Sequence, residues 1–308
     1  MPSRSSLARL QQAITLSLGA GALMWFLRHW ETSPGLALAG FLLIALGYSL
    51  FLATEFVALR FSGQADPLHR PSWRELAAAW LAETLTAPTV FCWRQPFFWR
   101  VVPDQLQPSP AGRSRRGVVF IHGFFCNRGF WTPWLRRMLS EGRCFAAVNL
   151  EPAFASIDDY AAIVDRAVLD VTAATGLPPI LIGHSMGGLA ARAWLRAAGT
   201  PMRVHHVITI GTPHRGTWLA RFSHVTNGSQ MKIVGDWIRE LERTERGVPA
   251  PGFTCWYSNC DNIVFPVTTA TRPGADNRLV RGAAHVDLAF RPQVMDECFA
   301  ILASSDPA

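Results

Sequence analysis

The stretch Pro178–Leu189, PPILIGHSMGGL, decides how the rest of the chain is interpreted. An apolar run ends at Gly183, Ser185 follows, and a helix-like stretch begins after Gly187. This order predicts a strand, a sharp turn and a helix, with the serine at the apex of the turn. The pattern G-x-S-x-G in that setting is typical of a nucleophile elbow, in which a strained backbone exposes the serine Oγ. Both glycines are expected because a Cβ at either position would collide with neighbouring backbone. A tight turn without chemistry is the alternative.

Strands and helices alternate on both sides of this turn. The expected strands are 118–121, 145–149, 180–182, 204–210, 254–257 and 278–280, and the expected helices are 157–174, 188–198 and one that starts near Pro292. Such alternation predicts an α/β fold with a parallel sheet that helices cover on both faces.

A serine nucleophile needs a base, and the base needs an acid that orients it. In a fold with a nucleophile elbow these groups follow in the order serine, acid, histidine, each on a loop after a later strand. Asp261 comes directly after the strand 254–257, and His285 comes after the strand 278–280. We therefore predict a catalytic triad of Ser185, Asp261 and His285. Asp276 and Asp287 are the alternatives for the acid.

An oxyanion hole needs two backbone N–H donors, one from the residue after the nucleophile and one from the loop after an early strand. These positions are Met186 and Phe124 in this sequence. His122 is expected to fix the early loop by a hydrogen bond, and Phe125 and His184 are expected to contact the substrate. The alternative for this loop is a simple turn that ends a strand.

Five segments together resemble the α/β-hydrolase fold and, within it, bacterial triacylglycerol lipases and related esterases. They are FIHGFF at 120–125, IGHSMGGL at 182–189, ITIGTPHRGT at 208–217, the Asp261 loop with its IVFP, and AAHVDL at 283–288. The resemblance extends from about Val118 to the C-terminus. It implies ester hydrolysis through an acyl-enzyme, with a mobile lid after TPHRGT.

The expected lid covers about 214–250, where apolar residues alternate with glycine breaks. A lid with an apolar underside would have this composition, and so would an ordinary helical insertion. The resemblance also implies that some lipases of this kind bind calcium beside an aspartate two residues after the catalytic histidine. Asp287 takes that position here, but no second acid is clearly placed. We therefore expect no metal and no other cofactor.

The N-terminal residues 1–62 contain two apolar segments, 13–27 and 36–59, separated by a polar turn. Glu55 is the single acid in the second segment. The lengths favour a hairpin of two transmembrane helices. A cleaved signal peptide is the alternative for the first segment, although a second apolar segment follows almost at once. A buried helical pair in a soluble protein is the other alternative.

Arginines orient this hairpin. Arg4 and Arg9 precede it, Arg60 and further arginines follow it, and Arg28 in the loop is opposed by Glu31. Positive residues concentrate on the cytoplasmic side of membrane proteins. We therefore expect a multi-pass protein of the bacterial inner membrane with a cytoplasmic catalytic domain.

A connecting segment, 63–116, joins the hairpin to the catalytic domain, 117–308. Ser72 and Glu75 form a capping box that predicts a helix up to about Thr86. The aromatic stretch 90–102 favours a covering helix and a strand packed on the domain, or a contact with the membrane surface. Residues 107–117 have the composition of a surface loop.

Composition excludes several classes of protein. The net charge is +7, but it comes from scattered arginines, with Lys232 the only lysine, so no nucleic-acid partner is expected. None of the six cysteines forms a C-x-x-C pair, so zinc is not expected. The sequence predicts a membrane-anchored serine ester hydrolase that acts on a hydrophobic acyl ester or lipid. A thioesterase or acyltransferase with the same triad is the alternative, followed by a non-catalytic membrane protein with a hydrolase-like domain.

Overall fold

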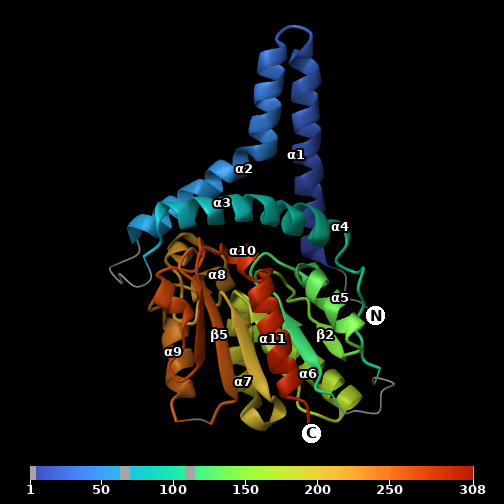
Figure 1. Ribbon diagram of the computed structural model, residues 1–308, viewed down its shortest axis with the longest axis vertical. Coiled ribbons are helices and arrows are strands. Elements are labelled where there is room, and N and C mark those ends of the chain that lie inside the picture. The colour runs from blue at the N-terminus through green and yellow to red at the C-terminus, as the bar shows by residue number, and fades with distance from the viewer. Residues whose placement is uncertain (1–4, 63–69, 108–114, 248, 308) are drawn as a thin grey trace.

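The computed structural model describes residues 5–62, 70–107, 115–247 and 249–307. Figure 1 shows an α/β body, a long helix that lies across one end of it, and two helices that project from that end. Arg4 and most of the surface loop expected over 107–117 lie outside the described residues.

Six parallel strands form one sheet in the order β2-β1-β3-β4-β5-β6. Their bounds are β1 Val118–Ile121, β2 Phe145–Ala147, β3 Ile180–His184, β4 His206–Ile210, β5 Gly252–Ser258 and β6 Asp276–Val280. The α/β prediction is confirmed, and the expected strands are present with shifted ends. Because all strands run the same way, their carboxyl ends meet at one edge of the sheet, and both faces require helices to cover them.

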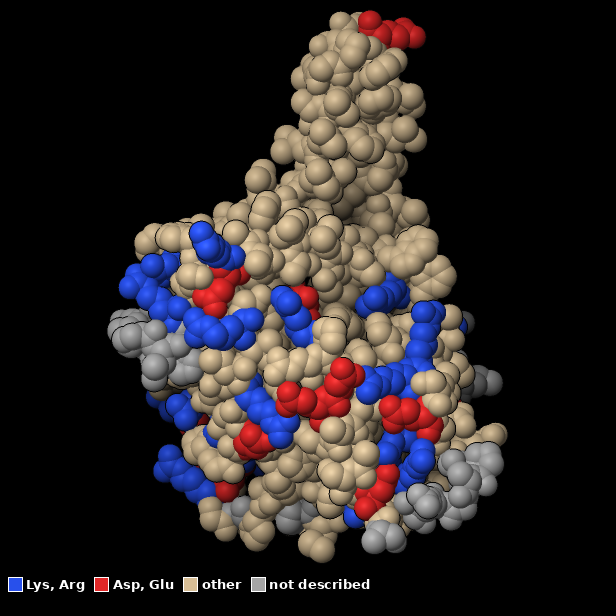
Figure 2. Space-filling view, in the orientation of Figure 1, with Lys and Arg blue, Asp and Glu red and all other residues tan. Residues whose placement is uncertain are grey.

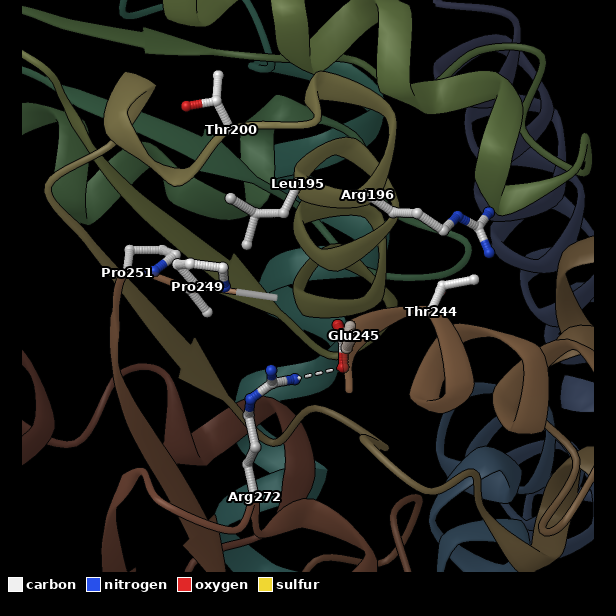
Figure 3. A pocket seen from close by; sticks show the side chains of 9 residues that line it. Leu195, Arg196, Thr200, Thr244, Glu245, Pro249, Pro251 and Arg272 are labelled. Atoms are coloured by element: carbon white, nitrogen blue, oxygen red, sulfur yellow. Dashed lines mark hydrogen bonds and ion pairs between the residues drawn. The ribbon is translucent and has the colours of Figure 1, made fainter. Parts of the chain in front are cut away.

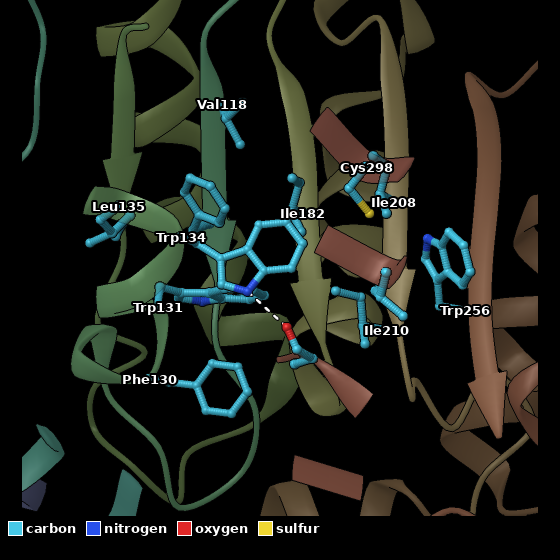
Figure 4. Close-up of a cluster of buried hydrophobic side chains, with 14 of the residues drawn as sticks. Val118, Phe130, Trp131, Trp134, Leu135, Ile182, Ile208, Ile210, Trp256 and Cys298 are labelled. Atoms are coloured by element: carbon cyan, nitrogen blue, oxygen red, sulfur yellow. Dashed lines mark hydrogen bonds between the residues drawn. The ribbon is translucent and has the colours of Figure 1, made fainter. Parts of the chain in front are cut away.

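Successive side chains of a strand point to opposite faces of the sheet, so alternate residues pack into two separate cores. The covering helices are α5 Thr132–Ser140 and α11 Pro292–Ser304 on one face, and α6 Ala161–Thr175 and α7 Met186–Ala198 on the other. Figure 4 shows part of the first core, which includes Trp131, Trp134, Ile182 and Ile208. The buried Trp134 Nε1–H donates to the carbonyl of Ala289 at 2.9 Å.

Two long apolar helices, α1 (Ser6–Trp30) and α2 (Pro34–Ser62), lie side by side and form the predicted hairpin. By length and composition both are able to cross a membrane, and only 11% and 6% of their most apolar windows are buried. On the face shown in Figure 2, the outer part of the hairpin carries no charge except at its tip, whereas the body carries both signs.

The next helix, α3 (Trp73–Pro88), lies across the end of the body from which the hairpin projects (Figure 1). It opens with the predicted capping box, in which Ser72 Oγ accepts from the Glu75 N–H at 3.2 Å and Glu75 Oε2 accepts from the Ser72 N–H at 2.7 Å. It packs on α2 and on α10 (His285–Leu288). The helix therefore connects the hairpin to the loop of the predicted catalytic histidine.

The strand expected within 90–102 is wrong, because no strand forms over these residues, all of which the structure describes. A π-helical turn, Thr89–Arg94, and the short helix α4, Gln95–Phe97, continue α3 instead. Val90 is fully buried in the core, whereas the Trp93 residue is 59% exposed. Aromatic residues border a core from a helix as readily as from a strand, so composition alone misassigned the element.

The insertion between β4 and β5 contains a 3-10 turn, Trp218–Phe222, and the helices α8 Thr226–Gln230 and α9 Asp236–Glu245. At its far end, Glu245 pairs with the buried Arg192 of α7 through two bonds of 2.9 and 2.8 Å. At its near end, Trp218 stacks on Phe265 in the loop that follows Asp261. The turn with Trp218 is thus a part of the expected lid that lies beside the predicted site, and a lid movement stays a prediction.

Candidate active site

All predicted catalytic residues lie at the carboxyl edge of the sheet. Ser185 follows β3, Asp261 follows β5 and His285 follows β6. The predicted oxyanion loop follows β1 at the same edge. Open parallel α/β sheets carry their ligand sites at this edge, because the loops that leave the strands converge there.

Ser185 has the strained backbone that a nucleophile elbow requires. Its φ is 54° and its ψ is −128°, in a region that non-glycine residues rarely occupy. A Cβ on Gly187 would come within 2.2 Å of the Ile121 carbonyl oxygen, and one on Gly183 within 2.7 Å of the Gly188 nitrogen. Strand and helix therefore meet as closely as the sequence predicted, with the serine held at the apex.

Asp261 and His285 are in direct contact and buried. Both carboxylate oxygens of Asp261 lie 2.9 Å from Nδ1 of His285. One of these oxygens also accepts the backbone N–H groups of Ile263 and Val264, at 3.0 and 2.7 Å, which fixes the carboxylate. Because a carboxylate only accepts, this contact places a proton on Nδ1 and leaves Nε2 of His285 free to act as a base.

The charge around His285 favours its protonated form. Burial disfavours the imidazolium, but the Asp261 carboxylate, with smaller effects from Glu83 and Glu55, raises the pKa of His285 above its ordinary value. A base whose pKa lies near the working pH is suited to proton transfer in both directions.

Ser185 is linked to this pair through the end of β4. Its N–H donates to the carbonyl of Ile210 at 2.9 Å. The next residue, Gly211, has φ 57°, and a Cβ placed on it would lie 3.1 Å from Asp261 Oδ2 and 3.3 Å from the His285 ring. The segment Ile210–Gly211 therefore lies against Ser185 on one side and against Asp261 and His285 on the other.

The loop after β1 lies against Ser185, as expected of an oxyanion loop. A Cβ on Gly123 would lie 2.8 Å from the Cβ of Ser185. In the described part of the chain, the N–H groups of Phe124 and Met186 have no hydrogen-bond acceptor, so both are available to an oxyanion. His122 fixes this loop as predicted: Nδ1 bonds the carbonyl of Gly123 at 2.9 Å and Nε2 accepts the N–H of Leu150 at 3.0 Å.

The two residues predicted to contact substrate occupy different environments. Phe125 also has a positive φ, of 55°, and its ring packs between Phe91 and Phe154. His184 is buried between Phe130, at a centroid distance of 4.3 Å, and His285, at 4.7 Å. The roles of Phe125 and His184 toward substrate stay predictions.

The carboxylates of the alternative acids pair with arginines and not with His285. Asp276 is exposed at the amino end of β6 and pairs with Arg278 at 2.7 Å. Asp287 pairs with Arg291 at 2.6 Å, which occupies the carboxylate that a calcium ion would need. The residues at this position do not fit a calcium site, and the described residues contain no cluster of three potential metal ligands.

A pocket at the end of α7 contains none of the predicted site residues. Figure 3 shows Leu195, Thr200 and Pro251 around it, with the Arg272–Glu245 ion pair of 3.0 Å along its border. Pro251 directly precedes β5, so this pocket lies toward the amino edge of the sheet, away from Ser185.

Three polar residues that reach the site from the N-terminal helices were not predicted as site residues. Gln11 of α1, Glu55 of α2 and Glu83 of α3 are buried and bond to the loops of the candidate site. One signal was present in the sequence, because an acid within an apolar segment is rare and has a defined partner. Glu55 is such an acid, but its partner lies more than two hundred positions away in the sequence.

The parallel sheet, the serine at a strained strand-to-helix turn and the buried Asp–His pair at the same edge define an α/β hydrolase of the lipase and esterase type. The chain belongs to the alpha/beta hydrolase family, whose model matches residues 118–302.

Curated relatives match parts of the chain. A triacylglycerol lipase from Burkholderia plantarii is 54% identical over 130 residues, which cover 39% of this chain and 36% of that protein. A triacylglycerol lipase from Pseudarthrobacter phenanthrenivorans is 54% identical over 56 residues, or 18% of this chain and 17% of that protein. The chain therefore spans little more than a third of the first relative and less of the second.

Solved structures share the fold. A lipase from Bacillus licheniformis in its mature form has a TM-score of 0.57 at 16% identity, over 65% of this chain and 96% of that one. Lipase B from Aspergillus fumigatus has a TM-score of 0.52 at 18% identity, over 64% and 56% of the two chains. At these identities the likeness concerns the fold alone.

Proposed function

We propose that this protein is a membrane-anchored serine ester hydrolase that cleaves a hydrophobic carboxylic acyl ester through an acyl-enzyme. The observation that carries the proposal is the combination, at one edge of the sheet, of Ser185 with φ 54° and the Asp261–His285 contact of 2.9 Å. Strained non-glycine residues persist where the surrounding structure enforces them, and they concentrate at functional sites.

Each residue then has a defined step. His285 Nε2 accepts the proton of the Ser185 hydroxyl as Oγ attacks the ester carbonyl. The N–H groups of Phe124 and Met186 stabilise the oxyanion of the tetrahedral intermediate. His285 gives its proton to the leaving alcohol, which departs and leaves the acyl group on Ser185. Water, deprotonated by His285, attacks this acyl-enzyme and releases the carboxylic acid, while Asp261 stabilises the imidazolium in both halves of the reaction.

Two features favour a lipid or another hydrophobic ester as substrate. The matching relatives from Burkholderia and Pseudarthrobacter are named triacylglycerol lipases. Aromatic rings also surround the oxyanion loop, with Phe125 between Phe91 and Phe154 and Phe124 against Phe154 at 5.8 Å. Such surroundings bury an acyl chain more favourably than a polar group.

Activity measurements on the full-length chain in detergent test the function. We expect fluorophosphonate labelling at Ser185, and hydrolysis of p-nitrophenyl esters that improves from short to longer acyl chains. Products formed with water alone and with added alcohol separate a hydrolase from an acyltransferase, and an acyl thioester tests the thioesterase alternative. A chain that neither hydrolyses esters nor reacts with the probe would contradict the proposal.

Placement in the membrane is a separate prediction. The protein is expected to fractionate with membranes, with its catalytic domain in the cytoplasm, because two spanning helices return the chain to its starting side and arginines lie outside both ends of the hairpin. A fluorescent protein fused after Ala308 should glow, and a phosphatase that is active only in the periplasm should stay silent.

The opposite pair of reporter results would place the catalytic domain outside the cytoplasm. That result would mean that α1 does not span and that α2 is a single anchor. A fusion directly after Trp30 is the matched control, since α1 alone should bring the phosphatase to the periplasm and make it active.

A further inference from the structure

Glu83 of α3 bonds to the backbone directly after the catalytic histidine. Its two carboxylate oxygens accept the N–H groups of Val286 and Asp287, each at 3.0 Å. The Glu83 residue is only 2% exposed. No arginine or lysine bonds to it among the described residues. Its carboxylate is stabilised by the N–H groups at the start of α10 and by the positive charge of protonated His285.

Glu55 of α2 reaches the same loops through one intermediate residue. Its Oε2 accepts from Nδ2 of Asn262 at 2.6 Å, and Oδ1 of Asn262 accepts the N–H of His285 at 3.1 Å. Asn262 follows Asp261 in the chain and is fully buried. Through Asn262, the neighbour of Asp261, the Glu55 carboxylate on the second apolar helix is thus connected to the backbone of His285.

The first apolar helix contacts the oxyanion loop. Nε2 of Gln11 donates to the carbonyl of Phe125 at 3.1 Å. Phe125 is one of three described non-glycine residues with positive φ, and Ser185 is another. The three N-terminal helices therefore each bond to one of the loops that carry the predicted site, and all three lie outside the part of the chain that the family model matches.

Burying carboxylates near Asp261 opposes stability, because desolvation and like charge both disfavour the ionised form. If these helices served only as an anchor, an amide or an apolar side chain at positions 55 and 83 would avoid that cost. A negative charge beside His285 does have a catalytic use, because it stabilises the imidazolium that forms as Ser185 loses its proton. The negative charge and the backbone hydrogen bonds therefore both act on His285.

We propose that Glu83 and Glu55 are positioning residues for His285, so that the N-terminal helices complete the catalytic centre as well as anchor it. Glu83 fixes the start of α10, and Glu55 holds Asn262 against the backbone of His285. This inference rests on the proposed triad. It adds that the charge supplied by α2 and α3 tunes the base.

The pH dependence follows from the groups that face His285. These are Asp261 from the loop after β5, Glu83 from α3, Glu55 from α2 and the ring of His184 from β3. Activity requires neutral His285, so it rises as the pH rises through the pKa of that residue. Burial raises the pKa of Glu83 to about 7, so this residue gains its charge only as the pH rises through about 7. Removing that charge lowers the pKa of His285, and the rise in activity then moves to lower pH.

The test is Glu83→Gln in the full-length protein, with Glu75→Gln as the matched control. Glu75 lies on the same helix, but it bonds Ser72, Asn259 and Arg281, and none of its hydrogen bonds among the described residues is to 285–287. We expect Glu83→Gln to lower kcat roughly 10- to 100-fold per labelled site, as for other residues that orient a functional histidine. The acid limb of its pH–activity profile, which is the rise of activity with pH, should also move to lower pH. Glu75→Gln should retain the acid limb of the wild type.

The readouts separate the possible failures. Wild-type protein that does not label at Ser185 would contradict the proposed function, whereas labelled Glu83→Gln with wild-type kcat and acid limb would overturn only this inference. The inference would also be overturned if Glu83→Gln and Glu75→Gln lost kcat equally, in proportion to their loss of Tm, and neither shifted its pH–activity profile. That result would show that Glu83 has a merely structural role. If Glu83→Gln does not fold, Glu55→Gln tests the same shift of the limb.

Discussion

Replacing Ser185 with alanine is expected to lower kcat by on the order of 10⁴-fold or more and to abolish fluorophosphonate labelling. The reason is that Oγ of Ser185 is the atom that forms the acyl bond in the proposed mechanism. The remaining groups would act only by polarising the ester and activating water. Ester hydrolysis and mass spectrometry of the labelled peptide measure both effects on the purified full-length protein.

The fold of this variant should be unchanged. Alanine keeps the Cβ and the backbone N–H that donates to Ile210, so circular dichroism and Tm should stay close to those of the wild type. Ser140→Ala is the matched control, because Ser140 is exposed at the end of α5 and bonds only the carbonyl of Arg137. Labelling that persists on another serine of Ser185→Ala would rule out the assignment.

Most of the sheet was predictable because the strands β1 to β4 are short apolar runs that end near glycine or polar residues. Ile180–His184 is the clearest case, since a Cβ on Gly183 or Gly187 would come within 2.7 or 2.2 Å of neighbouring backbone. Asp261 and His285 were predictable by their order along the chain and their places after β5 and β6. Their mutual contact needed the structure, because they are 24 positions apart and the segment between them includes an irregular loop and a further strand.

Helical irregularity was not predictable. The aromatic stretch after α3 forms a π-helical turn instead of a strand, and which of its rings face inward depends on the surface that it meets. The helix α5 was also missed, although its buried Trp134 and Leu135 form a large part of one core. Its buried residues Trp134, Leu135 and Met138 have the spacing of one helix face, so the sequence did carry a periodic signal, but over only nine residues.

The contribution of the N-terminal helices to the site was likewise not predictable, because it depends on the surface that these helices meet. An acid in an apolar segment indicates a polar partner, but sequence gives neither its identity nor its position. In the folded chain Glu55 meets Asn262, and Glu83 meets the start of α10. A hairpin predicted only as an anchor is therefore packed into the loops of the candidate site.

Replacing Asp261 with asparagine is expected to lower kcat by roughly 10⁴-fold while the protein stays folded. An amide NH₂ group facing Nδ1 would favour the tautomer with its proton on Nε2, and that nitrogen would no longer accept the Ser185 proton. The variant would also lack the negative charge that stabilises the imidazolium. The N–H groups of Ile263 and Val264 would still find an acceptor in the amide oxygen, so the loop should retain its shape.

Steady-state hydrolysis and the rate of fluorophosphonate labelling measure this loss, and both should fall because each depends on a deprotonated Ser185. Asp276→Asn is the matched control: its carboxylate pairs with Arg278 at the amino end of β6, so its kcat should stay close to the wild-type value. Asp287→Asn tests the remaining acid, which pairs with Arg291. If Asp261→Asn were to keep a near-normal rate while Asp287→Asn lost it, the acid of the triad would be Asp287, and the contact of Asp261 with His285 would have no catalytic role.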